Sequence, residues 1–191
     1  RLADTLIRPR RPWLAITHGL AGSGKTHYAD WLVERLPLIR LRSDVERKRL
    51  LGLAAAARTG SGVDRGAYRA RVSAATYRRL AHLARRLLKA GWPVLVDASF
   101  LAASERRRFA DLSASLGVPF RILACTAPPD VLRGRIERRA AQAEDASEAN
   151  LAVLDAQRAR YQPLGVEEQA LAIAIDTSRP YAVPGLPAGP P

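Results

Sequence analysis

The sequence predicts an α/β domain in which a five-stranded parallel sheet lies between two layers of helices. Five short apolar segments alternate with segments of helical period, an order typical of parallel sheets with helices on both faces. The segment PVLV before Asp97 is apolar throughout, as a strand buried on both faces should be. A glycine-rich loop joins the first apolar segment to the first helical one. A chain of 191 residues is long enough for one such domain and short for two.

Proline and glycine mark the ends of most expected helices. Pro37 stops the first helix, Gly52 closes the short second one, and Gly91 and Gly117 end two others. The strands are expected at residues 13–17, 38–42, 93–99, 119–127 and 171–177. The helices are expected at residues 25–36, 45–51, 68–90, 104–116 and 128–142, with a last one capped by Ser147 and ending near residue 161.

The predicted domain covers residues 13–179. Residues 1–12 are expected to be a lead-in or the end of a linker, and residues 53–66 the most mobile loop. The tail at 180–191 is rich in proline and glycine, so we expect it to be either disordered or packed as an extended strap. The chain starts at Arg1 and contains no methionine, which suggests a fragment or an excised domain.

The composition narrows the class of protein. No run of 18 apolar residues is present, so no membrane span is expected. The single cysteine, Cys125, lies in an apolar run and indicates a buried hydrophobe in a reducing, cytoplasmic compartment. The net charge of +13 would suit a nucleic-acid partner. However, the positive charge is mostly arginine spread over alanine-rich helices, so biased composition accounts for it as well, and we do not favour nucleic acid.

The stretch GLAGSGKT, Gly19–Thr26, has the pattern of a phosphate-binding loop between a strand and a helix. Its glycines let several peptide N–H groups point at one anion, and the helix that follows adds the positive end of its dipole. Lys25 is expected to reach the β- and γ-phosphates of ATP, and the Thr26 hydroxyl to bind Mg²⁺. The nucleotide-binding set is Gly19, Leu20, Ala21, Gly22, Ser23, Gly24, Lys25, Thr26 and His27. The imidazoles of His18 and His27 have no metal-ligand neighbours and are expected to be structural or at the surface.

Two aspartates follow expected strands and should converge on this loop. Because the carboxyl ends of parallel strands face one crevice, Asp44 and Asp97 are expected beside the loop. We expect Asp44 to accept the proton of an acceptor hydroxyl; the alternative is a helix cap provided by Ser43 or Asp44. Asp97 is expected to hold Mg²⁺ through water or to orient the acceptor, and the alternative is a carboxylate that merely ends a strand.

The helix expected at 128–142 is the candidate lid, with four arginines, Arg133, Arg135, Arg138 and Arg139. Arg135, Arg138 and Arg139 share one face, so one or two of them, with Arg135 and Arg138 as the catalytic candidates, could meet the phosphates as their charge develops. An ordinary solvated basic face is the alternative for at least two of the arginines.

The order of these motifs resembles a known family. GLAGSGKT, a strand ending in SD followed by VERKRL, then VLVDASF, an arginine-rich helix and a final strand ending in DT resemble the P-loop kinases of the polynucleotide 5′-kinase, zeta toxin and gluconate kinase group. The likeness covers residues 13–178. It is greatest to bacterial kinases fused behind an aminoglycoside phosphotransferase-like domain, and such an upstream fusion would explain the missing methionine. The resemblance implies that Asp44 is the base, that Arg47 touches the acceptor, and that Arg133 and the segment from Thr177 flank the adenine.

These observations lead to one preferred function and two alternatives. The preferred function is an ATP- and Mg²⁺-dependent phosphotransferase acting on a hydroxyl of a small or nucleotide-like acceptor. A polynucleotide 5′-hydroxyl kinase is the first alternative. A non-catalytic ATP-binding module that regulates a fused partner is the second. No motif in the sequence identifies the acceptor.

Overall fold

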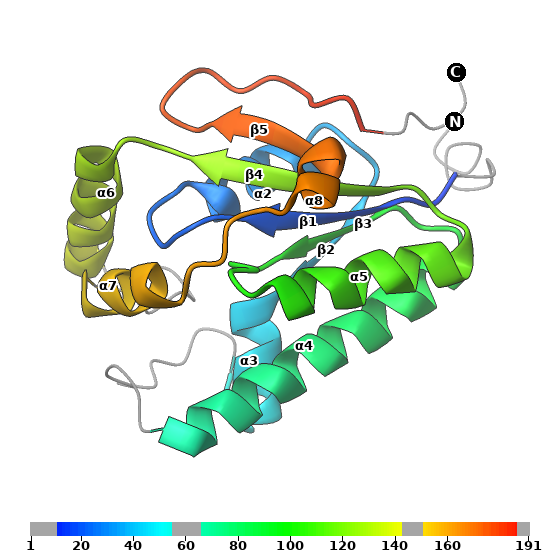
Figure 1. The fold of residues 1–191 in the computed structure, drawn as a ribbon, viewed down its shortest axis with the longest axis horizontal. Coiled ribbons are helices and arrows are strands. Elements are labelled where there is room, and N and C mark those ends of the chain that lie inside the picture. Colours follow the sequence, from blue (N-terminus) through cyan, green and yellow to red (C-terminus); the bar gives the residue numbers. More distant parts are fainter. Residues whose placement is uncertain (1–10, 55–65, 143–150, 187–191) are drawn as a thin grey trace.

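The computed structural model describes residues 11–54, 66–142 and 151–186. Within them, five parallel strands form one sheet in the order β2-β3-β1-β4-β5 (Figure 1). The strands are β1 (Leu14–His18), β2 (Ile39–Arg42), β3 (Val94–Asp97), β4 (Phe120–Thr126) and β5 (Ala172–Asp176). The expected α/β architecture with a five-stranded parallel sheet is confirmed.

Helices cover both faces of the sheet, with α4 and α5 on one face and α2 on the other (Figure 1). Because successive side chains of a strand point to opposite faces, Leu14 and Ile16 pack with α4 and α5, whereas Ala15 packs with α2. The helices are α2 (Lys25–Val33), α3 (Ser43–Leu50), α4 (Gly66–Lys89), α5 (Ala103–Leu116), α6 (Pro129–Gln142), α7 (Leu151–Arg160) and α8 (Val166–Leu171). None of the helices in the described ranges is long and apolar enough to cross a membrane.

The main departure from the expected elements is α8. This six-residue helix lies between the last expected helix and the last strand, and it is too short to produce a periodic pattern. A second difference is that α2 ends at Val33, because the chain tightens into a turn in which Arg35 N bonds to Leu32 O. The candidate cap Ser147 and most of the loop at 53–66 lie outside the described residues.

The tail packs as an extended strap over its described part, 180–186. Tyr181 lies edge-on to Tyr28 and Trp31, with ring centroids 5.1 and 5.8 Å away, and the Tyr28 hydroxyl donates to the Ala182 carbonyl oxygen at 2.9 Å. Cys125 is buried beneath the same layer, and burial raises the pKa of its thiol to about 12. The thiol is therefore neutral, as expected of a buried hydrophobe.

Candidate active site

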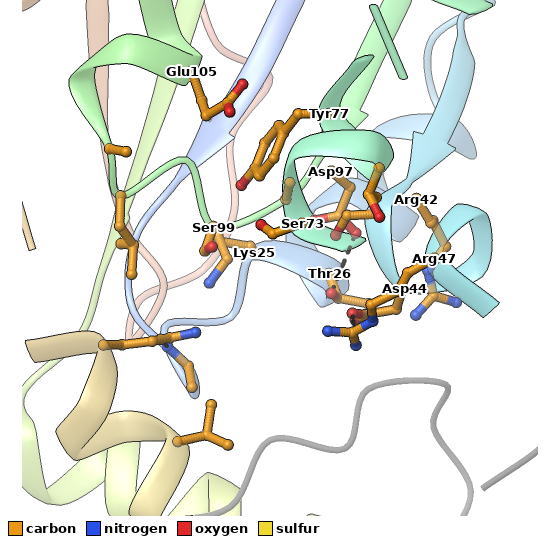
Figure 2. Close-up of a pocket in the computed structure, with 18 of the residues that line it drawn as sticks. Lys25, Thr26, Arg42, Asp44, Arg47, Ser73, Tyr77, Asp97, Ser99 and Glu105 are labelled. Carbon is orange, nitrogen blue, oxygen red and sulfur yellow. Dashed lines mark hydrogen bonds and ion pairs between the residues drawn. The ribbon is translucent and has the colours of Figure 1, made fainter. Parts of the chain in front are cut away.

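A cleft of about 1130 Å³ opens at the carboxyl edge of the sheet. The loop after β1, the first turn of α3, the end of β3 and the helices α4 to α7 all contribute to its lining. Figure 2 shows Lys25 and Thr26 from the glycine loop facing the same space as Asp44, Arg47 and Asp97. The structure therefore brings together the loop and the two strand-end aspartates, as the parallel topology predicts.

The glycine loop has backbone conformations that only glycine adopts easily. Gly22 and Gly24 have φ values of 78° and 76°. A Cβ at Gly22 would lie 2.5 Å from the Leu132 carbonyl oxygen, and one at Gly24 would lie 2.8 Å from the Thr177 hydroxyl. Both positions therefore require glycine for two reasons. The backbone has a positive φ, and a neighbouring element approaches closely, α6 at Gly22 and the end of β5 at Gly24.

Gly22→Ala is expected to weaken the binding of AMPPNP, a non-hydrolysable analogue of ATP, by at least about tenfold. This corresponds to a loss of roughly 1.4 kcal/mol of binding free energy. The loop can accept the methyl group only by moving away from Leu132, which misaligns its N–H groups. Calorimetric titration measures the affinity. Gly134→Ala is the matched control, since its Cβ would meet open space within α6 and should leave the affinity unchanged. Equal affinities of the two variants would contradict the prediction.

The Lys25 ammonium lies inside the loop. It donates to the Leu20 carbonyl oxygen at 2.6 Å and lies 3.3 Å from the Ser23 hydroxyl. At the helix end of the loop, the Thr26 hydroxyl donates to Asp97 at 3.2 Å. The hydroxyl and carboxylate predicted as the Mg²⁺ side of the site are therefore direct neighbours.

Asp97 is buried among donors that fix its orientation. The Arg40 guanidinium donates to one carboxylate oxygen at 2.5 Å, and the Thr17 hydroxyl lies 3.4 Å from the other. Hard oxygen donors of this kind fit Mg²⁺, which usually keeps several waters and takes few protein ligands. Because Arg40 already balances the charge of Asp97, the set suits a cation bound by Thr26 directly and by Asp97 through water. Arg40 itself carried no recognisable signal in the sequence.

Asp44 lies in the first turn of α3, which follows β2 directly. The cap position is occupied by Arg42, and no side-chain capping hydrogen bond forms there. Neither Ser43 nor Asp44 is therefore the cap, and that alternative is wrong. Instead Asp44 accepts from Arg47 at 2.8 Å, and both side chains stay partly exposed at the cleft. Asp44 and Arg47 are thus direct neighbours, and their roles as base and acceptor contact stay predictions.

The arginines of α6 separate into different roles. Arg135 donates to the Thr177 hydroxyl at 2.8 Å and to the Thr177 carbonyl oxygen at 2.7 Å. The Thr177 hydroxyl donates to the Ser23 carbonyl oxygen at 2.9 Å, so Arg135 and Thr177 together hold the glycine loop in position. Arg138 is exposed and lines the cleft, whereas Arg133 is exposed and outside its lining. The side chain of Arg139 lies outside the described residues. An arginine-rich lid is therefore not confirmed.

Helix α7 supplies residues that the sequence did not reveal. The Gln157 side chain accepts a hydrogen bond from the Ala21 backbone N–H at 2.6 Å, and Leu154 is buried against Ala21 and Ile136. Arg160, at the end of α7, also lines the cleft. These contacts join residues far apart in sequence, so no local pattern could have identified them.

The wall of the cleft formed by α4, α5 and the loop after β3 carries several polar side chains. Ser73 and Tyr77 on α4, Ser99 after β3 and Glu105 on α5 line this part of the cleft (Figure 2). The Tyr77 hydroxyl accepts from the Phe100 N–H at 3.2 Å, and burial raises its pKa. The tyrosine is therefore neutral and can offer its own proton to an acceptor hydroxyl or to Ser99.

The two histidines near the loop are structural or at the surface, as expected. His27 is exposed and lies edge-on to Tyr181. His18 is buried, with Nδ1 3.0 Å from the Phe100 carbonyl oxygen and Nε2 3.2 Å from the Tyr161 hydroxyl. Burial lowers the pKa of His18 from its ordinary 6.5, so the ring is neutral, with Nδ1–H donating to Phe100.

Acidification is expected to destabilise the fold in two stages. Because the pKa of His18 is lower in the folded protein, the unfolded chain binds the proton first as the pH falls. The contribution of neutral His18 to the free energy of unfolding is therefore full above about pH 6.5, and it is lost as the pH falls through the lower folded-state pKa. Glu168, whose pKa the Arg106 hydrogen bond lowers from 4.5, loses its contribution at more acidic pH. Urea unfolding from pH 7.5 down to about 2.5 measures both, and His18→Gln should flatten only the upper stage. Parallel curves for the two proteins would contradict this assignment.

Comparison with known proteins agrees with this geometry. A family model described as AAA domain matches residues 14–164. None of the curated proteins compared with the chain is similar enough to count as a match. Among solved structures, a candidate kinase from Chloroflexus aurantiacus is 25% identical over 88% of this chain and 87% of that protein, with a TM-score of 0.64.

Two further structures share the fold at lower identity. A gluconokinase from Sinorhizobium meliloti is 17% identical over 90% of this chain and 86% of that protein, with a TM-score of 0.57. An APS kinase from Mycobacterium tuberculosis, in complex with AMPPNP and APS, is 23% identical over 88% of this chain and 91% of that protein, with a TM-score of 0.57. The upstream aminoglycoside phosphotransferase-like domain stays a prediction. Since the family model spans residues 14–164, the chain belongs to the AAA domain family, as a P-loop protein with the fold of phosphotransferring kinases.

Proposed function

We propose that the protein is an ATP- and Mg²⁺-dependent phosphotransferase that moves the γ-phosphoryl group to a hydroxyl of a small acceptor. The observation that carries the proposal is the placing of Asp44 in the same cleft as Lys25 and the Thr26–Asp97 pair. Phosphoryl transfer requires a charge clamp and an aligned acceptor, and little covalent chemistry from the protein. The cleft offers both within one continuous space.

In the proposed reaction, the acceptor oxygen forms a bond to the γ-phosphorus while the bond from that phosphorus to the β–γ bridging oxygen breaks. The acceptor proton passes to the Asp44 carboxylate, and ADP leaves with the bridging oxygen. Lys25 and the N–H groups of the glycine loop stabilise the charge on the phosphates. Mg²⁺ held by Thr26 and by Asp97 through water would neutralise further phosphate charge when bound. Arg47 orients the acceptor beside Asp44.

The polar wall supports a small hydroxylated acceptor over a polynucleotide. On that wall, apolar side chains lie among five hydroxyl groups and one carboxylate, which belong to Ser73, Thr76, Tyr77, Ser99, Ser104 and Glu105. The described aromatic group there is Tyr77, whose ring already packs against Phe100 with centroids 5.1 Å apart. Single-stranded nucleic acid is usually held by aromatic platforms on which bases stack. The hydroxyls and the carboxylate on this wall suit hydrogen bonding to a polyol instead.

Labelling with γ-³²P-ATP and Mg²⁺ tests the proposal on a panel of acceptors. The panel contains gluconate and other sugar acids, neutral sugars, adenylyl sulfate, and DNA and RNA oligonucleotides with 5′-hydroxyl ends. Label in a small acceptor supports the proposal, and label confined to oligonucleotides would favour the polynucleotide alternative. AMPPNP binding without transfer to any acceptor would favour the regulatory module and overturn the proposal.

Arg138 is the arginine proposed to meet the transferring phosphoryl group. It lines the cleft, and the hydrogen bond described for its guanidinium goes to the Gly134 carbonyl oxygen of its own helix at 3.2 Å. Arg138→Ala is expected to lower kcat by about 10³-fold, the lower end of the effect of such arginines. Arg86→Ala is the control, because it removes an exposed arginine of α4 outside the cleft lining. Similar rates for both variants would assign Arg138 to a solvated face.

A further inference from the structure

Arg106 is a buried arginine to which the proposed reaction gives no role. Its side chain is only 1% exposed. The guanidinium donates to both carboxylate oxygens of Glu168, at 2.7 and 2.8 Å. It also donates to the carbonyl oxygens of Phe100, Leu101, Gln162 and Pro163, at 3.0 to 3.1 Å. A fork of five N–H donors is fully used here, which a lysine could not reproduce.

One side of this cluster is the loop after β3, residues 98–102. Ala98, Ser99, Leu101 and Ala102 line the cleft, and the Ser99 carbonyl oxygen accepts from the Gly19 N–H at 3.1 Å. Phe100 lies between them with a φ of 48°, the only positive φ of a non-glycine residue in the described chain. Such a conformation persists only where surrounding contacts hold it. The Phe100 carbonyl oxygen accepts from both Arg106 and His18, so this cluster supplies those contacts.

The other side is the segment that leaves α7, residues 161–168. Gln162 N donates to the Leu101 carbonyl oxygen at 3.1 Å, and the Gln162 side chain accepts from Ala103 N at 2.7 Å. The Tyr161 hydroxyl adds the contact with His18 at 3.2 Å. Figure 1 shows this segment running from α7 to α8, and the bonds seat it on the N-terminal end of α5. Helix α7 itself contacts the glycine loop through Gln157.

We propose that Arg106 is a positioning residue that fixes the wall formed by residues 98–102 to the segment leaving α7, and so sets the geometry of the acceptor side of the cleft. The proposal deepens the proposed function, because it takes that wall as the acceptor side. A buried charge is not needed merely to fill the space, since apolar residues of similar size often stabilise a fold as well or better. Arg106 instead donates to carbonyl oxygens of two separate segments, and these hydrogen bonds hold the segments together. The later part of the glycine loop, at Gly22 and Ser23, is held by other residues, Arg135 and Thr177.

Glu168→Gln and Arg106→Lys test the proposal, with Arg107→Lys, an exposed neighbour on α5, as the matched control. Glu168→Gln keeps the shape of the carboxylate that pairs with Arg106 but removes its charge. It therefore tests the proposal even if the Arg106→Lys protein does not fold. Hydrogen–deuterium exchange of peptides covering 97–104 and 160–168 is measured with AMPPNP affinity and urea stability. In both test variants, exchange should rise in the two segments together. The dissociation constant of AMPPNP should stay within about threefold of the wild-type value. The control should match wild type throughout.

Kinetics with an acceptor found by the labelling panel add a readout that loss of stability alone would not produce. The acceptor KM should rise more than kcat falls, with a loss of kcat/KM on the order of 10²-fold, as misplacement of a substrate by about 1 Å can cause. Exchange that rises in one segment only, rises evenly over the chain, or does not rise would overturn the proposal, as would an equal loss of AMPPNP affinity. The exchange and AMPPNP results do not depend on transfer. If no acceptor in the panel is labelled, the proposed function is wrong. The exchange measurements would still show whether Arg106 positions the two segments.

Discussion

Asp44→Asn is expected to reduce phosphoryl transfer by about 10² to 10⁴-fold, the usual contribution of a general base. The amide keeps the size of the carboxylate and can still accept a hydrogen bond from Arg47, but it cannot take up the acceptor proton. ATP binding should change little, because the glycine loop, Lys25 and Thr26 are untouched. Steady-state kinetics with the labelled acceptor and titration with AMPPNP measure the two effects separately.

Asp111→Asn is the control for this substitution. It makes the same chemical change at an exposed position of α5 outside the cleft lining, so it should be silent in both assays. The ion pair lost in Asp44→Asn is partly exposed, and its loss should cost less than about 1 kcal/mol of unfolding free energy. A fully active Asp44→Asn variant would remove Asp44 from the role of base and leave it as a partner of Arg47.

Lys25→Ala should damage nucleotide binding and transfer together. Its ammonium is the cation held within the glycine loop, and it is proposed to move from the Leu20 carbonyl oxygen to the β- and γ-phosphates. Since charge develops on these phosphates during transfer, the loss of kcat should reach about 10² to 10³-fold, as for other preorganised donors, in addition to weaker AMPPNP binding. Lys89→Ala removes an exposed lysine at the end of α4 and serves as the control.

The comparison of these two variants separates the roles. A Lys25→Ala protein with normal AMPPNP affinity would show that the backbone of the loop alone holds the phosphates. A loss of transfer in Asp44→Asn accompanied by an equal loss of AMPPNP affinity would place Asp44 on the nucleotide side. The proposed function requires the opposite pattern, with affinity lost only when Lys25 is removed.

Much of the nucleotide side could be predicted because its signals are local. The glycines, Lys25 and Thr26 follow one strand without interruption, and Asp97 follows the apolar segment PVLV. Parallel topology then places the ends of β1, β2 and β3 at one edge without any further information. Asp44 was predicted in the same way. The assignment of Thr177 to the adenine came from resemblance alone, and in the structure its side chain is buried beneath the loop and bonded to Arg135.

The remaining contacts could not be predicted, because each joins positions without a shared pattern. Arg40 looks like any strand arginine until it meets Asp97, 57 residues away. Gln157 meets the N–H of Ala21 across 136 residues, and Arg106 meets Glu168 across 62. Arginine is common throughout this chain, so composition gave no reason to single out Arg106. Helix α8, which positions Glu168, was itself too short to predict.

The amino-acid sequence by itself determined the class of fold, the phosphate-binding loop and the two aspartates beside it. Those features depend on periodicity, on glycine and proline positions, and on the rule that parallel strands end at one edge. Only the tertiary structure decided which arginine holds the loop, which others line the cleft, and how residues 98–102 are held to the segment after α7. The physical reason is that a guanidinium takes its role from the acceptors that packing brings within about 3 Å, and those acceptors lie on other elements of the fold.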